Sequence, residues 1–507
     1  MDVNALPNIL SCCCPPVDGL WLAWILCAGF ILLARWPYFR LPLHGDTGFY
    51  VSNATITAKK FRFSEGWNAH YAGASKFLPE WFYSRIYLLF GHQRYPAMFR
   101  LWMSFYLALA CGVVGWTCRF YLNQDVWVSI AAMVSFSFLS LEVVYQTYFE
   151  TAEQFEIIPQ FLGFGLIEHG LSTGRPVEVL LGLSLWWIDG IWIKLPALGG
   201  ALVWSAYIVI QDSAWSVPVV AISGFWAVVF IVWQRVFAPS WKETCGRLIG
   251  HEKHSGHALS PRSYFQQIIK QLKTFQAIIA RFPFVPLLAV VPVCFGFQSS
   301  AGLWVYLSIL AVIWFFQSAS MPYYVLPFQP VMALFAAWGA YFLFKHSPWA
   351  WTIFAVLGMA WALRHFVRPM TLTKKEFNQW AYLGHPLCVP NLQNWRLLEL
   401  APEIEQAIGP GTKATLFMFG DGGNQLYMIL DRSYPTPLVA ASTWLDPMHQ
   451  GWREDLRASF AKRPPDYIFS YRRHFERSAP SDFWPLKIVS IRKWDDGCEL
   501  FRCAQKA

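Results

Sequence analysis

The chain has 507 residues, of which 55% are hydrophobic and only 14% are charged. Soluble domains usually carry roughly 25% charged residues, so this composition excludes a protein that is surrounded by water along its whole length. The 28 Trp are typical of a membrane protein, because indole rings favour the headgroup level of a bilayer, and the net charge of +9 favours contact with anionic lipid or an anionic substrate.

Apolar segments recur along the first 365 residues. A bilayer-spanning helix needs about 20 mainly apolar residues, and candidate spans lie near 19–35, 99–118, 126–145, 157–171, 177–193, 194–210, 216–233, 282–298, 303–319, 322–344 and 349–364. We therefore predict a polytopic α-helical transmembrane domain of about 11 helices over residues 1–365. The first apolar segment lacks a preceding basic stretch and a clear cleavage site, so we interpret it as a retained helix.

The first long loop, about residues 36–98, combines an acid, a cation and an amphipathic helix. Asp46 follows the first span and lies between two glycines, which let the backbone approach a ligand closely. Lys76 precedes Pro79–Phe90, which we expect to form a short interfacial helix, because Pro suits the first helical turn and the following Gly91 suits its end. Asp46 is therefore a candidate catalytic carboxylate, and a loop carboxylate that only caps a helix is the alternative.

A second acidic group, which contains Glu150, Glu153 and Glu156, lies between the third and fourth spans. Carboxylates beside a bilayer core are costly to bury and are functional candidates by default. By the order of the helices they lie on the same side of the membrane as Asp46. Glu153 is the first and Glu150 the second further catalytic candidate, and a solvated turn with acids at a helix start is the alternative.

The second long loop, about residues 234–281, is basic. His251, His254 and His257 have a spacing at which neutral imidazoles could bind a divalent metal, although a solvated loop is the simpler interpretation. From residue 260 on, apolar residues recur at helical spacing among Gln and Lys. This pattern predicts a basic amphipathic helix that lies on the bilayer, and a helix that packs on a partner is the alternative.

The character of the sequence changes after about residue 365. Helical periodicity covers 392–408 and 424–431, and strand-like patterns cover 415–419, 466–471, 487–493 and 498–503. We therefore predict a small soluble α/β domain over residues 366–507. The glycine cluster at 420–423 resembles a phosphate-binding turn loosely, and a plain turn is the simpler interpretation.

The order of several short motifs resembles the membrane-embedded glycosyltransferases of the GT-C fold, in particular the bacterial lipid-A aminoarabinose transferase and protein O-mannosyltransferase-like group. Asp46-Thr47-Gly48-Phe49-Tyr50 resembles the acidic motif that opens the first extracytoplasmic loop of that family. Lys76-Phe77-Leu78-Pro79 is similar to its Lys-Pro-Pro-Leu element, and Phe90-Gly91 to the end of the next helix. Lys194-Leu195-Pro196 and Tyr323 to Pro330 resemble later elements. The chain departs from the pattern at Thr47, where many members carry a second acid, and in the missing second proline after Lys76.

This resemblance implies an inverting transfer of a hexose or a pentose from a polyprenyl-phosphate carrier to a lipid, glycan or protein acceptor, with no role for nucleic acid. It implies that Asp46 accepts the proton of the acceptor hydroxyl. Lys76, with Arg62 or Arg85, would bind the donor phosphate where negative charge develops. The family often keeps an acid near the acceptor or a metal in the loop of Glu153, so a divalent metal ion is a possible cofactor.

Two patterns disagree on the orientation of the chain. The family keeps its catalytic loops outside the cytoplasm, which implies an integral protein of the bacterial inner (plasma) membrane whose catalytic loops and tail domain lie on the outer side. The side that holds Asp46 nevertheless carries the basic loops, which the positive-inside rule would place in the cytoplasm. We follow the family, since long loops weigh less in that rule.

Two other functions compete with the glycosyltransferase. A membrane transporter or lipid flippase would need ionisable residues in its spans, and Asp189 and Lys194 lie in apolar segments, although the two halves of the chain show no symmetry. A non-catalytic scaffold whose tail binds a partner is the third possibility.

Overall fold

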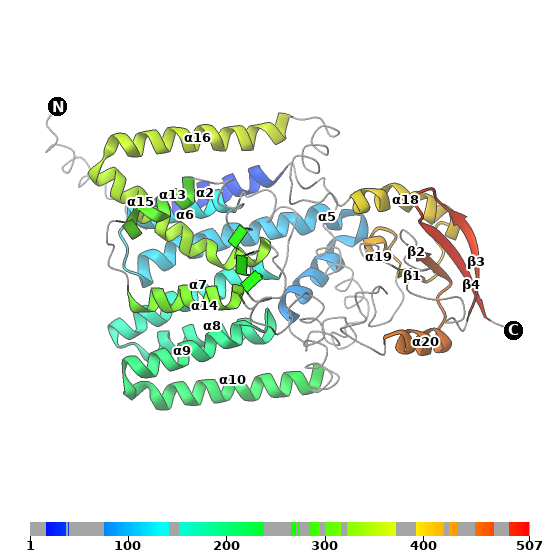
Figure 1. Ribbon diagram of the computed structural model, residues 1–507, viewed down its shortest axis with the longest axis horizontal. Helices are drawn as coiled ribbons and strands as arrows, with labels where there is room; N and C mark the ends of the chain where they lie inside the picture. The colour runs from blue at the N-terminus through cyan, green and yellow to red at the C-terminus, as the bar shows by residue number, and fades with distance from the viewer. Residues whose placement is uncertain are drawn as a thin grey trace.

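The computed structural model describes residues 17–36, 39, 76–140, 152–237, 265–266, 268–269, 272–273, 284–294, 300–315, 322–371, 392–419, 425–432, 452–470 and 486–505. Within these ranges a bundle of helices is followed by a small α/β domain, which lies at one end of the bundle (Figure 1).

The bundle contains α2 (Val17–Arg35), α5 (Phe77–Trp116), α6 (Val126–Leu139), α7 (Glu153–Thr173), α8 (Pro176–Trp192), α9 (Ala197–Gln211), α10 (Ser216–Phe237), α13 (Phe284–Cys294), α14 (Ala301–Phe315), α15 (Gln329–His346) and α16 (Pro348–Thr371). Three short elements join some of them, namely the π-helix η4 (Thr117–Tyr121) and the 3₁₀ helices η5 (Ser213–Trp215) and η6 (Pro322–Phe328). The positions of these helices agree with the predicted spans.

Within the described ranges, three segments, Ala97–Tyr121, Ser213–Phe237 and Val325–His346, are long and apolar enough to cross a membrane. Shorter apolar helices among the described residues include Gly19–Arg35 and Val126–Leu139. The fold is thus mostly helical with several apolar helices, while the expected total of about 11 crossings stays a prediction.

Helices α7 and α8 approach each other closely because glycines face each other between them. A Cβ added at Gly163 would stand 3.0 Å from the carbonyl oxygen of Gly182, and one at Gly182 would stand 2.6 Å from the carbonyl oxygen of Gly163. Small residues at such positions let helix backbones touch. The approach brings the first turns of α7, with Glu153 and Glu156, next to the last turns of α8, with Asp189, and all three acids are buried.

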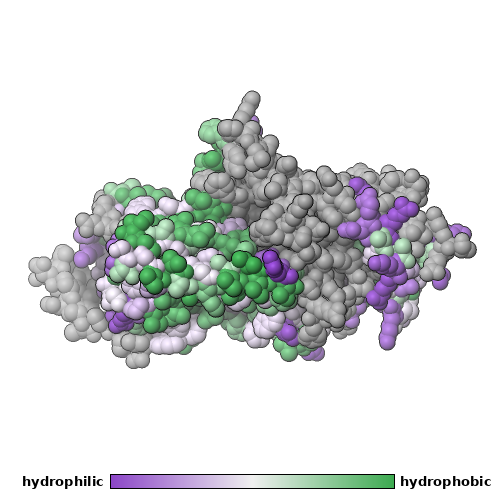
Figure 2. Space-filling view, turned by 90° about the horizontal axis from the view of Figure 1, so that it is seen from below, coloured by the Kyte–Doolittle hydropathy of each residue, from purple (hydrophilic) through white to green (hydrophobic). Residues whose placement is uncertain are grey.

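Helix α10 lies along the outside of the bundle (Figure 1). All of its 22 residues are described, and only Val219 and Gln234 are buried. Its outer face carries Val, Ile and Phe side chains that are more than half exposed, among them Val217 at 78% and Phe225 at 56%. Figure 2 shows hydrophobic residues over much of the helical part and hydrophilic residues over the tail. Exposure of this apolar face is explained by contact with lipid.

Helix α5 has two arms that meet at Gly91, where φ is 67° and ψ is 171°. A positive φ of this kind suits glycine, which has no Cβ to clash. The first arm, Phe77–Phe90, is the predicted interfacial helix and begins at Phe77 rather than Pro79. The second arm leads into the span Ala97–Tyr121. The predicted stop at Gly91 is therefore a kink between two arms.

The predicted amphipathic helix in the second long loop is described at Phe265, Gln266, Ile268, Ile269, Leu272 and Lys273, and each of these residues is helical. Phe265 is 64% and Leu272 48% exposed. Exposed apolar side chains on a basic segment agree with a helix that rests on the bilayer.

The tail contains α18 (Leu392–Ile408), α19 (Gln425–Ile429), α20 (Trp452–Lys462) and a four-stranded sheet of β1 (Leu416–Phe419), β2 (Tyr467–Ser470), β3 (Leu486–Lys493) and β4 (Glu499–Gln505). The strand order is β1-β2-β4-β3, with β1 and β2 parallel and the other pairs antiparallel. The predicted α/β character is confirmed, whereas α20 was missed. The boundary at residue 366 stays a prediction, and 420–423 lies outside the described residues.

Arg432 closes the end of α18 inside the tail. Its guanidinium donates to both carboxylate oxygens of Glu405, at 3.1 and 2.9 Å, and to the carbonyl oxygens of Gly409, Thr412 and Ala414 at 2.8–3.2 Å. The carbonyls at a helix end need such donors. Arg432 directly follows the segment that contacts the bundle, so these hydrogen bonds tie that segment to the end of α18.

The tail meets the bundle at the interfacial arm of α5. Ile429 of α19 packs against a buried cluster that includes Tyr83, Tyr87, Phe155 and Ile193. The Tyr87 hydroxyl also donates to Asp431, which directly precedes Arg432. The cluster therefore joins the interfacial arm, the start of α7, the segment after α8 and the tail at one place.

Candidate functional site

Lys76 caps the interfacial arm in a conformation that is uncommon for a residue with a side chain. Its φ is 66° and its ψ is 19°, in the left-handed region, while its carbonyl accepts a hydrogen bond from Glu80 N at 3.1 Å. The half-buried side chain lies within electrostatic range of Glu156. Backbone strain of this kind gathers at functional sites, so Lys76 is a candidate on conformation as well as on charge.

Glu153 and Lys194 form a buried ion pair. Lys194 Nζ lies 2.6 Å from Glu153 Oε1, and the two side chains are 10% and 2% exposed. Glu153 is the first residue of α7, where the free N–H groups of the helix favour negative charge. Lys194 follows α8 in a turn whose N–H groups bond the Asp189 carbonyl oxygen at 2.8 Å. Glu153 is therefore not part of a solvated turn, and the pair ties α7 to α8.

A carboxamide bridges two buried carboxylates one turn deeper. Gln160 Nε2 donates to Asp189 Oδ2 at 2.7 Å and to Glu156 Oε1 at 3.2 Å. All three side chains are at most 1% exposed. Among the described residues, Glu156 Oε2, Asp189 Oδ1 and Gln160 Oε1 have no hydrogen-bond partner. Leaving a buried polar atom unpaired costs about 1–3 kcal/mol, so these oxygens make the group a candidate for a functional role.

A tyrosine hydroxyl bonds a backbone carbonyl that a proline in α7 leaves without its helical partner. Pro159 lies inside α7 and has no N–H, so it cannot donate to the carbonyl of Phe155 four residues earlier. The Tyr106 hydroxyl of α5 donates to that carbonyl oxygen at 3.0 Å. The second arm of α5 is therefore fastened to the first turn of α7, which carries Glu153 and Glu156.

Buried arginines surround this end of the bundle. Arg35 and Arg100 are at most 1% exposed, and Arg35 Nε donates to Ser104 Oγ at 2.8 Å. The Arg85 guanidinium stands 5.4 Å from the centre of the Trp81 ring. Arg85 was predicted as a phosphate ligand, whereas Arg35 and Arg100 were not, because an arginine at the end of an apolar helix usually extends to the membrane surface.

An apolar groove of about 250 Å³ runs along α10 and is lined by Phe225, Val228, Val229, Val232, Trp233, Val236 and Phe237. At its end the ring centre of Trp233 lies 4.7 Å from that of Phe77, which is the neighbour of Lys76 in the chain. A second ring, Trp192, lies 5.8 Å from Trp233. The lipid-facing groove thus ends beside the cation at the start of the interfacial arm.

The structure places Lys76, Arg85 and Glu153 of the predicted site at one end of the bundle. Asp46, Arg62 and Glu150, and the three His of the predicted metal site, His251, His254 and His257, lie outside the described residues. Among the residues that are described, no group of three or more His, Cys, Asp or Glu could hold a metal ion. A bridge between Glu156, Gln160 and Asp189 was not predicted, although Asp189 and Lys194 stood out as charges in apolar segments.

No protein-family model matches the sequence, and no curated protein matches it. Among solved structures, ArnT from Cupriavidus metallidurans bound to undecaprenyl phosphate is similar with a TM-score of 0.59 and 14% identity, over 96% of this chain and 98% of that chain. Its apo state gives a TM-score of 0.55 and 13% identity over the same shares. The Archaeoglobus fulgidus oligosaccharyltransferase, in complex with Zn and sulfate, gives 0.45 and 12% over 89% of this chain and 68% of that chain. The likeness to ArnT covers bundle and tail together. The chain therefore has the fold of ArnT, the GT-C fold that the order of motifs predicted.

Proposed function

We propose that this chain is an inverting glycosyltransferase that moves a hexose or pentose from a polyprenyl-phosphate carrier to a lipid, glycan or protein acceptor. The proposal rests on three features that lie together. A strained lysine, a buried Glu–Lys pair and a lipid-facing groove meet at the same end of a bundle whose fold is that of ArnT.

The donor fits the groove of α10 and the cation at its end. An isoprenoid chain is apolar and would lie against the Val and Phe side chains of α10, where burial of apolar surface is favourable. Its phosphate would then reach the start of the interfacial arm, where the Lys76 ammonium can bind it as a charged donor. The undecaprenyl phosphate bound to the similar ArnT structure supports this class of ligand.

The reaction needs a base on one side of the sugar and positive charge on the other. We propose that the Asp46 carboxylate takes the proton of the acceptor hydroxyl while its oxygen bonds to the anomeric carbon. The bond between that carbon and the phosphate oxygen breaks, and polyprenyl phosphate leaves with the electron pair. Attack from the face opposite the phosphate inverts the anomeric centre. Lys76, with Arg62 and Arg85, would stabilise the phosphate as its negative charge grows.

Glu153 would act beside the base rather than replace it. Its contact with Lys194 fixes the direction of the carboxylate, which suits a group that orients an acceptor hydroxyl by accepting its hydrogen bond. Glu150 would serve the same acceptor from the preceding loop. A divalent metal, held by His251, His254 or His257, would add positive charge at the donor phosphate if that loop reaches it.

A transfer assay with a charge-neutral variant tests the proposal. Purified protein in vesicles would receive a polyprenyl-phosphate sugar and an envelope extract as acceptor, and mass spectrometry would detect the glycosylated product. Asp46→Asn keeps the shape of the side chain and is expected to lower the rate by about a hundredfold or more. Asp125→Asn is the matched control, because Asp125 only caps α6 and Asn caps equally well. Transfer by the Asp46→Asn variant at the wild-type rate would contradict the role of Asp46.

We further propose that the site faces the outside of the bacterial inner membrane, where a lipid-linked donor meets envelope acceptors. A reporter fused after Tyr471 would separate the two orientations. Alkaline phosphatase activity is the expected result, because this enzyme folds in oxidising compartments. Fluorescence from a cytoplasmic reporter at the same position would overturn the orientation.

A transporter or lipid flippase is the alternative, and the buried group of Glu156, Gln160 and Asp189 is the observation that favours it. Ionisable residues inside apolar helices often form proton or ion paths. The two functions separate in vesicles that hold labelled carrier lipid on one side. Movement of intact carrier across the bilayer without release of its sugar would support transport, and sugar transfer without such movement would support the enzyme.

A further inference from the structure

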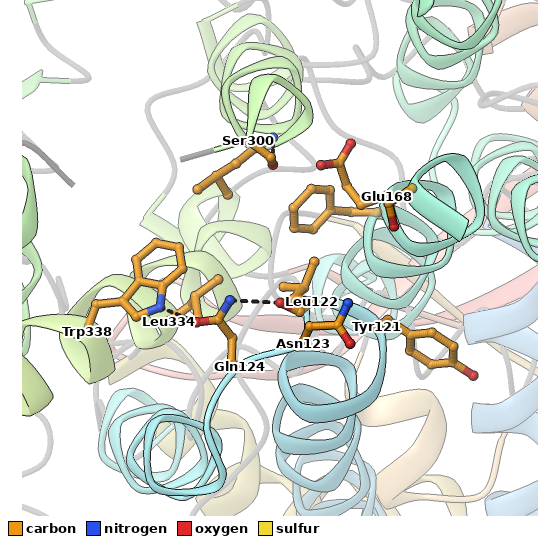
Figure 3. A pocket seen from close by; sticks show the side chains of 11 residues that line it. Tyr121, Leu122, Asn123, Gln124, Glu168, Ser300, Leu334 and Trp338 are labelled. Atoms are coloured by element: carbon orange, nitrogen blue, oxygen red, sulfur yellow. Dashed lines mark hydrogen bonds between the residues drawn. The ribbon is translucent and has the colours of Figure 1, made fainter. Parts of the chain in front are cut away.

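A second pocket opens at the end of the bundle opposite Lys76 (Figure 3). It has a volume of about 190 Å³, and its walls come from the loop after η4, the end of α7, the start of α14 and the middle of α15. Its carboxylate, Glu168, lies about four turns beyond Glu153 along α7, or about 22 Å at about 1.5 Å per residue. The pocket is therefore separate from the proposed active site.

One wall of the pocket is held by a chain of hydrogen bonds. Trp338 Nε1 donates to Gln124 Oε1 at 2.7 Å, and Gln124 Nε2 donates to the Leu122 carbonyl oxygen at 2.8 Å. Between these residues Asn123 adopts a positive φ of 50°. The loop follows the π-helix η4, a kind of turn that is frequent at functional sites. The wall is thus fixed before any ligand arrives.

Glu168 is fixed as well. A Cβ added at Gly302 would stand 1.8 Å from Glu168 Oε1, so only glycine lets the carboxylate lie against the start of α14. The Tyr207 hydroxyl donates to the carboxylate at 3.4 Å, and Ser300 also hydrogen-bonds it. Figure 3 shows the side chain of Glu168 beside Ser300 at the edge of the pocket. These contacts fix the direction of the carboxylate at the edge of the pocket.

We propose that this pocket binds a primary ammonium group. Glu168 is the single acidic residue among the described residues that line it, and no Lys, Arg or His is among them. The lining rings of Phe164 and Trp338 attract a cation through their faces, and the side-chain oxygens of Asn123 and Ser172 can accept ammonium hydrogens. A phosphate or carboxylate ligand would instead meet an acid, with no cation among the described residues that line the pocket.

The size of the pocket restricts the ligand. About 190 Å³ is below the roughly 300–1,000 Å³ typical of drug-sized sites, so the guest is a small head group. Two sources offer the same chemistry at this depth. One is the ethanolamine head of a membrane lipid, and the other is a soluble primary amine.

Native mass spectrometry of the full chain in micelles tests the proposal and separates the sources. The protein would be offered phosphatidylethanolamine, phosphatidylcholine or phosphatidylglycerol, and free ethanolamine as a competitor. We expect retention of phosphatidylethanolamine at least about tenfold above phosphatidylglycerol, the scale of one charge-assisted hydrogen bond. Phosphatidylcholine should bind more weakly, since its ammonium has no hydrogen to donate. Thermal stabilisation by free ethanolamine together with equal retention of the three lipids would assign the pocket to a soluble amine.

Two variants and a control complete the test. Glu168→Gln removes the charge, and Ser172→Phe fills the pocket from its exposed rim and leaves the acid in place. Both are expected to lose the preference for the amine. Glu178→Gln is the matched control, because Glu178 is an acid at the same end of the bundle whose partners, His169 and Arg175, are not among the described residues that line the pocket. If the Glu168→Gln variant does not fold, the lipid preference of the Ser172→Phe variant tests the proposal. The proposal would be overturned if folded Ser172→Phe kept the amine preference of the wild type. It would also be overturned if the wild type showed neither a preference among the lipids nor stabilisation by ethanolamine.

Discussion

Replacement of Lys194 by Met is expected to destabilise the bundle far more than replacement of both members of its ion pair. Lys194 Nζ lies 2.6 Å from Glu153 Oε1, and the side chains are 10% and 2% exposed. Removal of one partner leaves the other charge buried, which costs about 3–5 kcal/mol. The double variant Glu153→Gln with Lys194→Met buries no charge and should lie within about 1–2 kcal/mol of the wild type, since apolar or neutral substitutes for a buried pair are often neutral in stability.

The free energy of unfolding can be measured in mixed micelles by titration with a denaturing detergent, with Trp fluorescence as the signal. Arg175→Ala supplies the matched control, because Arg175 is 63% exposed and its ion pair with Glu178 is screened by water. That variant should lose less than about 1 kcal/mol. The loss of stability in Lys194→Met should therefore exceed the loss in Arg175→Ala severalfold.

Sugar-transfer activity, measured in Lys194→Met, the double variant and Arg175→Ala, separates a structural from a functional role of the Glu153–Lys194 pair. If the Glu153 carboxylate orients the acceptor, the double variant regains stability and still fails to transfer sugar. A double variant that is stable and fully active would show that the pair only holds α7 and α8 together. A double variant that is as unstable as Lys194→Met would refute the electrostatic reasoning itself.

Three further predictions concern the interfacial arm and the tail. Lys76→Gly should lower donor binding yet raise the melting temperature relative to Lys76→Ala, because glycine adopts the φ of 66° without strain of about 1–3 kcal/mol. The pKa of Tyr87 is raised above its ordinary value of 10.0, mainly by burial and also by the Asp431 carboxylate. The contribution of the Tyr87 hydroxyl to stability is therefore present below pH 10 and is lost only above it. Tyr87→Phe should therefore speed proteolytic release of the tail by a constant factor between about pH 6 and pH 9, and a factor that changes over that range would implicate another titrating group. Arg432→Lys should destabilise the tail by about 2–4 kcal/mol in thermal unfolding, because lysine cannot reproduce the bidentate contact with Glu405, and an unchanged melting temperature would contradict this role.

Periodicity alone located the helices, because each apolar segment must form its hydrogen bonds internally in a bilayer. The same pattern found α18 and all four strands of the tail. It missed α20, which has 11 residues, and among those whose burial is described the apolar side chains of Leu456 and Phe460 are fully buried. A surface helix of this kind carries too weak an apolar stripe to be distinguished from a loop.

The site was predicted less completely, for a different reason. Lys76 and Glu153 stand near helix starts and attract attention as charges in short motifs. The bridge from Gln160 to Asp189 joins residues 29 positions apart, and it depends on the contact of Gly163 with Gly182 between two helices. Periodicity reports which face of a helix is apolar and contains no information on which neighbour that face meets. Long-range partners of this kind therefore require the packed structure.

Pro159 and Tyr106 depend on each other through one carbonyl group, that of Phe155. A lineage that exchanges Pro159 for an ordinary residue regains a helical N–H for this carbonyl, and selection for a hydroxyl at position 106 then relaxes. If the Tyr106 hydroxyl is lost before Pro159 is replaced, the Phe155 carbonyl oxygen is left without this hydrogen-bond donor. The two positions should thus change in a preferred order during evolution, with the proline replaced before the tyrosine.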